Sequence, residues 1–158
     1  MTLMPPPIAV VDTLTSLLEA EMNSVFRFMG EGAPHLSRAA ADVRRPLADM
    51  VVAEQRRAER LADLIDSFGS TPTPQAAIRR DEQFLAFLSL KFLLPKLVDE
   101  KRLQIQRYEN AMRVVPKNET GVVNLLSGHL SELRQELASL ERASEQVIAA
   151  ARAERQKA

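Results

Sequence analysis

The chain of 158 residues lacks cysteine and tryptophan, and it contains one tyrosine and two histidines. Without cysteine, disulfide bonds, thiolate metal sites and cysteine nucleophiles are excluded. The imidazoles available as ligands or bases are then those of His35 and His129. The sequence also lacks a glycine-rich phosphate loop and a nucleophile elbow, which are typical of nucleotide binding and of acyl transfer.

The chain also has no excess of positive or negative charge, because 21 basic residues balance 21 acidic ones. A net charge of zero argues against a nucleic acid partner or an anionic membrane surface. No run reaches the roughly 18 apolar residues that a membrane span needs. The first seven residues include three prolines and no basic segment followed by an apolar one, unlike a signal peptide. We therefore expect a disordered segment over 1–7 and a cytoplasmic protein.

Alternating apolar and polar runs are scarce, whereas apolar residues recur at helical spacing in four long segments. Glycine and proline separate these segments, which cover about 8–29, 37–68, 78–115 and 120 to the end. Pro46 is expected to start or kink the second segment, and Pro95 to kink or divide the third. The pattern predicts an all-α antiparallel four-helix bundle over 8–142, with 143–158 as a helical extension or frayed tail.

Two glutamates interrupt apolar helix faces. Glu21 lies in the middle of one stripe and Glu54 in the middle of another. The surrounding apolar residues are Val10, Leu14, Leu17, Leu18, Val25 and Phe28 for the first, and Leu47, Met50, Val51, Ala58, Leu61, Ile65 and Phe68 for the second. An unpaired buried carboxylate costs several kcal/mol. Each glutamate should therefore have a metal ion or a buried cation beside it.

Several motifs resemble those of ferritin-like proteins, including bacterioferritins and rubrerythrins. The stretch EMNSVFRF (21–28) resembles their first-helix signature, and EQRRAERL (54–61) resembles the second-helix Glu-x-x-His-Ala-Asp/Glu-Arg motif. GSTP (69–72) is similar to the turn that follows. IQRY (105–108) and the leucine-rich stretch 127–140 resemble parts of the third and fourth helices. The resemblance implies a ferritin-like bundle with a long crossover between helices two and three.

Ferritin-like bundles of this kind bind two iron ions through four glutamates and two histidines. Matched residue by residue, this chain keeps Glu21 and Glu54. It has Arg57 at the place of the second-helix histidine. It keeps His129 on the fourth helix, but Leu126 stands where the accompanying glutamate should be.

The third-helix glutamate is matched to Lys101, which is central in an inward stripe. Glu100 is the rival match, although it points about 100° away from the centre of that stripe. The apolar residues of the stripe are Leu94, Leu97, Val98, Ile105, Tyr108 and Met112. With this match, Lys101 is the third position, after Arg57 and Leu126, at which a metal ligand of the family is absent from this chain.

We interpret Arg57 and Lys101 as cations that pair with Glu21 and Glu54 in place of the metal. A guanidinium cannot bind a metal ion, and it suits pairing with carboxylates. This reading predicts a degenerate, non-enzymatic bundle without a cofactor, acting as a structural or interaction module.

The alternative is a di-iron or mono-iron oxidase, or an iron-handling protein, with an altered ligand set. Its ligands would come from Glu21, Glu54, His129 and Glu100, and its cofactor would be iron. It requires Glu100 to replace Lys101 at the site and the Arg57 side chain to turn outward, away from the site.

The remaining polar residues are assigned ordinary roles. We expect Tyr108 to form a hydrogen bond in the core, and His129 to donate to a carboxylate or a carbonyl. Glu132, Glu136 and Glu141 are expected to be ordinary residues of the last helix.

The segment 84–98 is apolar nearly all round, more than one side of a bundle can bury. We expect its surface to contact a second copy or another protein. The residues that would form the contact are Phe84, Phe87, Leu88 and Phe92. The alternative is a site for a lipid, a quinone or another apolar ligand.

Overall fold

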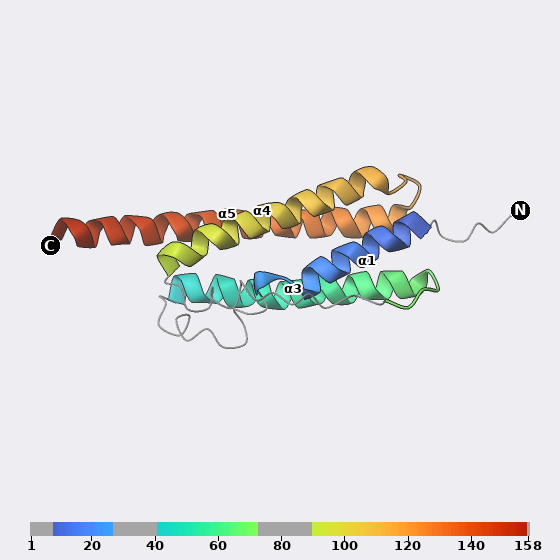
Figure 1. Cartoon of the computed structure of the whole chain (residues 1–158), viewed down its shortest axis with the longest axis horizontal. Coiled ribbons are helices and arrows are strands. Elements are labelled where there is room, and N and C mark those ends of the chain that lie inside the picture. Colours follow the sequence, from blue (N-terminus) through green and yellow to red (C-terminus); the bar gives the residue numbers. More distant parts are fainter. Residues whose placement is uncertain (1–7, 27–40, 73–89, 158) are drawn as a thin grey trace, which may run out of the picture.

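The computed structural model describes residues 8–26, 41–72 and 90–157. These residues form helices and no strands, which confirms the all-α prediction. The helices are α1 (Ile8–Met22), α3 (Ala41–Ser67), α4 (Leu90–Val114) and α5 (Thr120–Lys157), and they form one bundle (Figure 1).

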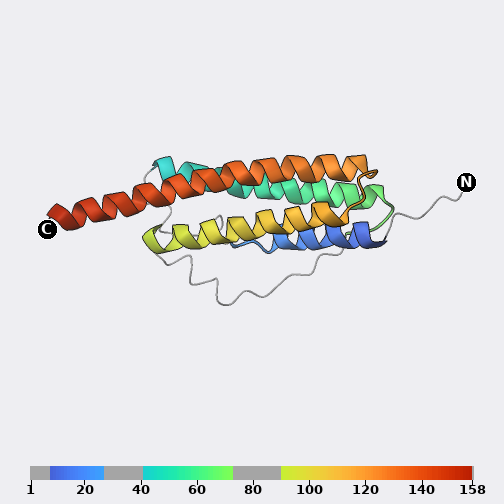
Figure 2. The same ribbon diagram turned by 90° about the horizontal axis from the view of Figure 1, so that it is seen from above.

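The helix directions match the predicted topology. In Figures 1 and 2, α1 and α5 run one way along the bundle, and α3 and α4 run the other way. The most extensive packing joins α4 with α5, followed by α1 with α3. Because α3 ends where α5 begins, and α4 begins at the opposite end, the connection from 73 to 89 joins the two ends of the bundle. The long crossover between the second and third helices is therefore confirmed.

The core consists of two apolar clusters arranged along the bundle axis. The first includes Leu14, Leu61 and Leu133, and the second includes Met50, Leu94 and Leu140. On α3, α4 and α5, charged residues lie between the stretches that contribute to the two clusters. Near the end of α1, Glu21 lies between the first-cluster residues of this helix and the second-cluster residues Val25 and Phe26, which follow it. The charged residues are Glu21 on α1, Glu54 and Arg57 on α3, Lys101 on α4 and Glu136 on α5. The fold thus places a charged layer between two apolar cores.

The first helix is shorter than the predicted segment 8–29. It ends at Met22 and is followed by a turn at Asn23. The Ser24 Oγ then accepts a hydrogen bond from the Phe26 backbone N–H at 3.2 Å, as an N-cap does. Serine and asparagine favour such caps over helix interiors, which explains the break. Phe28, which the sequence places in the apolar stripe around Glu21, lies outside the described residues.

The helix α3 ends just before Gly69, as expected for a glycine that terminates a helix. Gly69 has a φ angle of 81°, and its N–H donates to the Asp66 carbonyl at 2.9 Å. This is the left-handed conformation that glycine adopts without a Cβ penalty.

Both internal prolines lie within continuous helices. Pro46 is not the start of α3, which begins at Ala41, and the alternative in which Pro95 divides the third helix is wrong. Each proline lies in the sixth position of its helix. A proline there removes one hydrogen bond close to the helix start, where few bonds have formed, and α4 continues past it.

The last helix continues to Lys157, and its C-terminal part extends beyond the other helices in Figures 1 and 2. Ala143 is buried, and Val147 still packs against the second cluster. The division of the chain at 142 stays a prediction. None of the four helices has a stretch long and apolar enough to cross a membrane, a finding that covers the described residues only.

Candidate functional site

The charged layer is almost completely shielded from solvent. Glu21 and Glu54 are at most 2% exposed, and Arg57 and Lys101 have no exposed surface. Three different helices, α1, α3 and α4, contribute these four side chains. The structure therefore brings together the four residues at which the sequence predicted a buried charged group.

Arg57 is bonded to three carboxylates. Its Nε donates to Glu21 Oε1 at 3.1 Å, and its Nη1 lies 3.2 Å from Glu136 and 3.4 Å from Glu132. Burial alone would lower the pKa of Arg57, but the charges of Glu21 and Glu136 raise it above its ordinary value. The guanidinium is therefore a permanent positive charge that links α1 and α5 through α3.

Lys101 binds Glu136, one of the three carboxylates that bind Arg57. Its Nζ donates to Glu136 Oε2 at 3.2 Å and lies 4.1 Å from the centroid of the Phe26 ring, a cation–π distance. Burial lowers the pKa of Lys101, and the charge of Glu136 opposes this shift. Glu136 thus joins both buried cations.

The sequence-based reading of Glu132 and Glu136 as ordinary helix residues is wrong. The Glu136 side chain is only 11% exposed and binds Arg57 and Lys101, while Glu132 binds Arg57 and Arg60. A sequence signal was available: Glu136 follows the inward-facing His129 by seven residues, which is two helical turns.

A hydrogen-bonded chain links Glu21 to His129 through Tyr108, which confirms the core hydrogen bond predicted for this tyrosine. The Tyr108 hydroxyl donates to Glu21 Oε1 at 2.9 Å and lies 3.0 Å from His129 Nδ1. Because the single hydroxyl proton goes to Glu21, Nδ1 must donate its own proton to the tyrosine oxygen. His129 therefore donates to a hydroxyl rather than to the predicted carboxylate or carbonyl.

The second imidazole nitrogen, His129 Nε2, is then an acceptor, and it has no hydrogen-bond partner among the described residues. Burial lowers the pKa of His129 to about 4, and the charge of Arg57 adds to this effect. His129 is thus neutral at physiological pH.

Glu54 differs from the sequence-based interpretation. Neither of its carboxyl oxygens has a hydrogen-bond partner in the described part of the chain. Burial raises the pKa of Glu54 to about 8, and the nearby charge of Glu21 contributes. The predicted ion pair between Glu54 and a cation is wrong, because Arg57 and Lys101 bind other carboxylates. At neutral pH, Glu54 is therefore protonated.

The other predicted site residues lie at the edge of the layer or outside it. Glu100 is on a different face of α4, with its carboxylate 4.0 Å from Arg107. Leu126 is fully buried in the first apolar cluster. Phe92 is 59% exposed. Phe84, Phe87, Leu88 and His35 lie outside the described residues.

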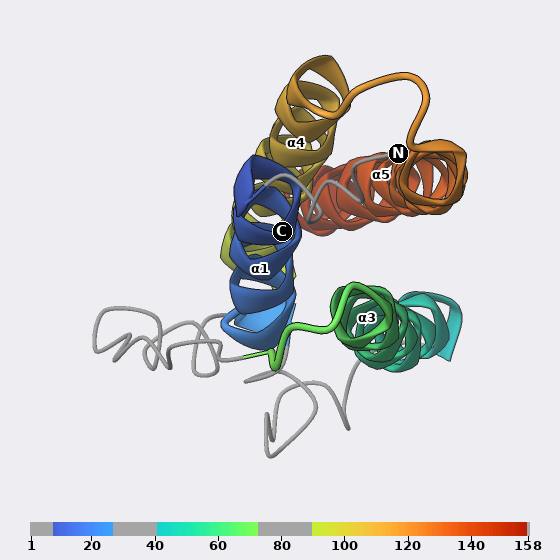
Figure 3. The ribbon, with the colours of Figure 1, turned by 90° about the vertical axis from the view of Figure 1, so that its right-hand side faces the viewer.

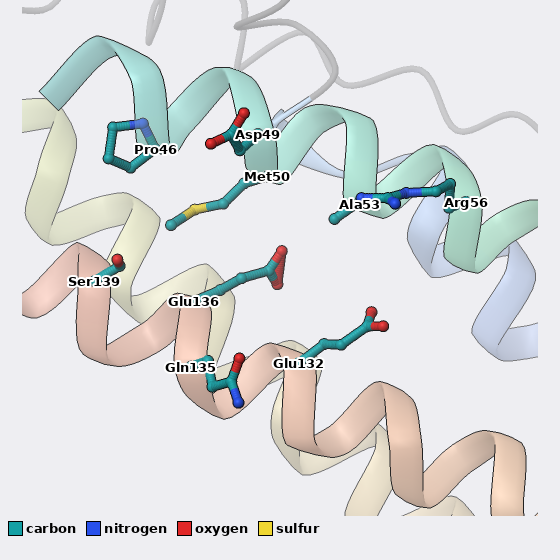
Figure 4. Close-up of a pocket in the computed structure, with 9 residues that line it drawn as sticks. All are labelled: Pro46, Asp49, Met50, Ala53, Arg56, Glu132, Gln135, Glu136 and Ser139. Atoms are coloured by element: carbon teal, nitrogen blue, oxygen red, sulfur yellow. The ribbon is translucent and has the colours of Figure 1, made fainter. Parts of the chain in front are cut away.

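A groove between α3 and α5 leads from solvent to the layer. Its volume is about 430 Å³. In Figure 4, Glu132 and Glu136 extend from α5 toward α3, where Asp49 and Arg56 lie. The groove is completed by Pro46, Met50, Ala53, Gln135 and Ser139. Glu136 therefore has contacts on two sides, with the buried cations inside and with the groove outside.

Comparison with known proteins identifies the fold. The sequence matches no family model and no curated protein. The structure is similar to the Desulfovibrio desulfuricans bacterioferritin, a protein with a diiron site, with a TM-score of 0.70, 18% identity, and coverage of 89% of this chain and 80% of that one. It is also similar to a dodecameric, bacterioferritin-related thioferritin from Bacteroides fragilis, with a TM-score of 0.73, 18% identity, and coverage of 92% and 90%. The chain thus has the ferritin-like fold that the motifs predicted.

The residues present do not fit the di-iron centre that this fold can contain. Arg57 and Tyr108 already bind Glu21 Oε1, and Leu126 offers no donor atom. Arg57 and Lys101 place positive charge in the layer where a cation would have to bind. Among the residues that the structure describes, no group of three or more histidine, aspartate or glutamate side chains could bind a metal ion. The side chains of the layer form ion pairs with one another rather than a set of metal ligands.

Proposed function

We propose that this protein is a degenerate ferritin-like bundle that acts as a structural or interaction module. The observation that supports this function is the buried Arg57 guanidinium, bonded to Glu21, Glu132 and Glu136. A permanent cation at this position repels Fe²⁺ and occupies carboxylate oxygens that would otherwise bind it. The ion pairs would then connect the helices, as the metal does in di-iron bundles.

A second candidate function is iron handling with an altered ligand set. The observation that favours it is a pair of buried groups, His129 Nε2 and the Glu54 carboxyl group, for which the described residues provide no hydrogen-bond partner. An imidazole and a carboxylate are suitable iron ligands. This candidate requires the loss of the Glu54 proton and tolerance of the nearby Arg57 charge.

Iron loading distinguishes the two functions. After anaerobic incubation with excess Fe(II) and desalting, we expect mass spectrometry to find far less than one iron ion per chain. The triple substitution Arg57→His, Lys101→Glu and Leu126→Glu restores the ligand types of a di-iron bundle and is expected to create iron binding. One or two iron ions in the unmodified protein, lost in Glu54→Ala, would support the second candidate instead.

The comparison variant for this experiment is Arg56→His with Glu100→Gln. It changes neighbouring positions that lie on other helix faces. Iron binding by this variant would show that the gain in the triple variant does not depend on the charged layer.

We further propose that the protein is cytoplasmic and forms a homodimer through the third-helix surface that includes Phe92. The thioferritin with the same fold is a dodecamer, which supports self-association. Phe92 is largely exposed, as expected of a residue that a second copy could cover. Sedimentation analysis is expected to give twice the chain mass, and Phe92→Glu to shift it toward one chain mass. A monomer that binds apolar dyes would favour a lipid or quinone site instead.

A further inference from the structure

The solvent-facing side of α4 has exposed apolar residues at a regular spacing. Phe92, Leu103 and Val114 are 59%, 43% and 61% exposed, and each follows the previous one by 11 residues. Eleven residues make almost three complete helical turns, so these side chains lie on one line along the helix. Single exposed apolar residues are ordinary, whereas a line of them along one helix is typical of a contact surface.

The polar residues between them are arranged symmetrically about Leu103. Asp99 and Arg107 lie four residues before and after Leu103, and Lys96 and Asn110 lie seven residues before and after it. Each is within about 40° of Leu103 around the helix axis, so all of them face the same way. The acidic residue on one side of Leu103 corresponds to a basic residue on the other. A second copy of this helix that runs in the opposite direction is therefore complementary to the first.

Asp99 and Arg107 have exposed surface left for such a partner. The Asp99 side chain is 78% exposed, and its contact with Arg102, another exposed residue, measures 3.7 Å. The Arg107 side chain is 35% exposed, and its Nη1 lies 4.0 Å from the Glu100 carboxylate. A guanidinium has several N–H donors, so Arg107 can bind a second carboxylate. In an antiparallel pair, Asp99 of each copy meets Arg107 of the other, whereas a parallel pair brings like charges together.

A groove between α1 and α4 can receive the largest side chain of the apolar line. The groove has a volume of about 370 Å³, and its lining includes Leu17 on α1 and Val114 on α4. In the antiparallel arrangement, Phe92 of one copy lies opposite Val114 of the other, because both are 11 residues from Leu103. A cavity of about 150 Å³ already admits a benzene ring, so the groove has room for the phenylalanine.

We propose that two copies of this chain pair through α4 in an antiparallel arrangement, with a two-fold axis that passes beside Leu103. Asp99 of each copy binds Arg107 of the other, and Phe92 inserts into the groove next to Val114 of the other copy. The inference rests on the proposed homodimer and specifies its geometry. Because both copies use the same surface, the contact is closed and does not continue into a filament.

Introduced cysteines test which residues meet, because the chain has none of its own. Lys96→Cys and Asn110→Cys leave the apolar line and the charged pair unchanged. When the two variants are mixed and mildly oxidised, we expect a disulfide-linked dimer that contains one chain of each, identified by its mass. Neither variant alone should cross-link, because its two cysteines would be about 21 Å apart along the helices, too far for a disulfide.

Exchange of charges tests the ion pairs. Asp99→Arg and Arg107→Asp should each raise the dissociation constant of the dimer at least about tenfold, because like charges then face each other at two places. A mixture of the two variants should regain the dimer, since each arginine again meets an aspartate, and this recovery requires that both variants are folded. The control Glu59→Arg changes an exposed residue of α3 and should sediment like the unmodified protein.

The results that overturn the inference differ from those that overturn the dimer. A dimer in which Lys96→Cys cross-links with itself would have parallel helices and contradict the antiparallel arrangement. A dimer without a cross-link between positions 96 and 110 would have its contact elsewhere, so the inference fails while self-association stands. Sedimentation of the unmodified protein at one chain mass would overturn both.

Discussion

Replacing Glu136 by glutamine is expected to lower the free energy of unfolding by about 3–5 kcal/mol. Glu136 is the shared partner of Arg57 and Lys101, whose side chains have no exposed surface. The amide of glutamine keeps the shape of the side chain but removes its charge. Arg57 and Lys101 then lose the charged partner that they share. Urea unfolding followed by circular dichroism measures the loss.

Glu141→Gln is the matched control on the same helix. Glu141 binds Arg102 at 3.3 Å, but the two side chains are 43% and 58% exposed. Water and salt screen such a pair, so its loss should cost at most about 1 kcal/mol. Equal effects of the two substitutions would show that Glu136 is solvated through the groove and that the buried layer does not depend on it.

The bundle could be predicted from the sequence because its main determinants are local. Helical spacing of apolar residues gives the helices, and Gly69 with the following prolines marks the end of α3. The short glutamate motifs then indicate which four-helix topology the chain adopts. The break after Met22 was missed because the preference of Ser24 for capping competes with a continuous apolar stripe.

The partners within the charged layer could be predicted only in part. Burial of Glu54 and Lys101 follows from their positions in apolar stripes, and both are buried. Which carboxylate pairs with which cation depends on how neighbouring helices are rotated and shifted relative to one another. The spacing of apolar residues along a single helix does not determine this. Glu136 is not one of the regularly spaced leucines of α5, such as Leu133, Leu137 and Leu140, so the sequence alone predicts that its charge faces solvent. The structure brings it to both cations and leaves Glu54 without either.

Arg57→Met is expected to have the second large effect, a loss of about 3–5 kcal/mol in the free energy of unfolding. Methionine fills much of the same space without a charge, so Glu21 and Glu136 lose the cation that they share. The neighbouring Arg56 is exposed and lines the groove, and Arg56→Met should change stability by no more than about 0.5 kcal/mol. Thermal or urea unfolding of both variants measures the difference.

A double-mutant cycle with Glu21→Gln separates the ion pair from the packing of the arginine stem. The contact between Arg57 Nε and Glu21 Oε1 measures 3.1 Å. If it is a buried ion pair, Arg57→Met leaves the Glu21 carboxylate without a compensating charge, whereas in the Glu21→Gln protein there is no carboxylate to compensate. The arginine substitution should then cost less in the Glu21→Gln protein, with a coupling energy of about 1–3 kcal/mol. Tyr108 can still donate to the glutamine oxygen, so its hydrogen bond is conserved through the cycle. Strictly additive effects would mean that Glu21 is already neutral and that Arg57 stabilises the bundle through α5 alone.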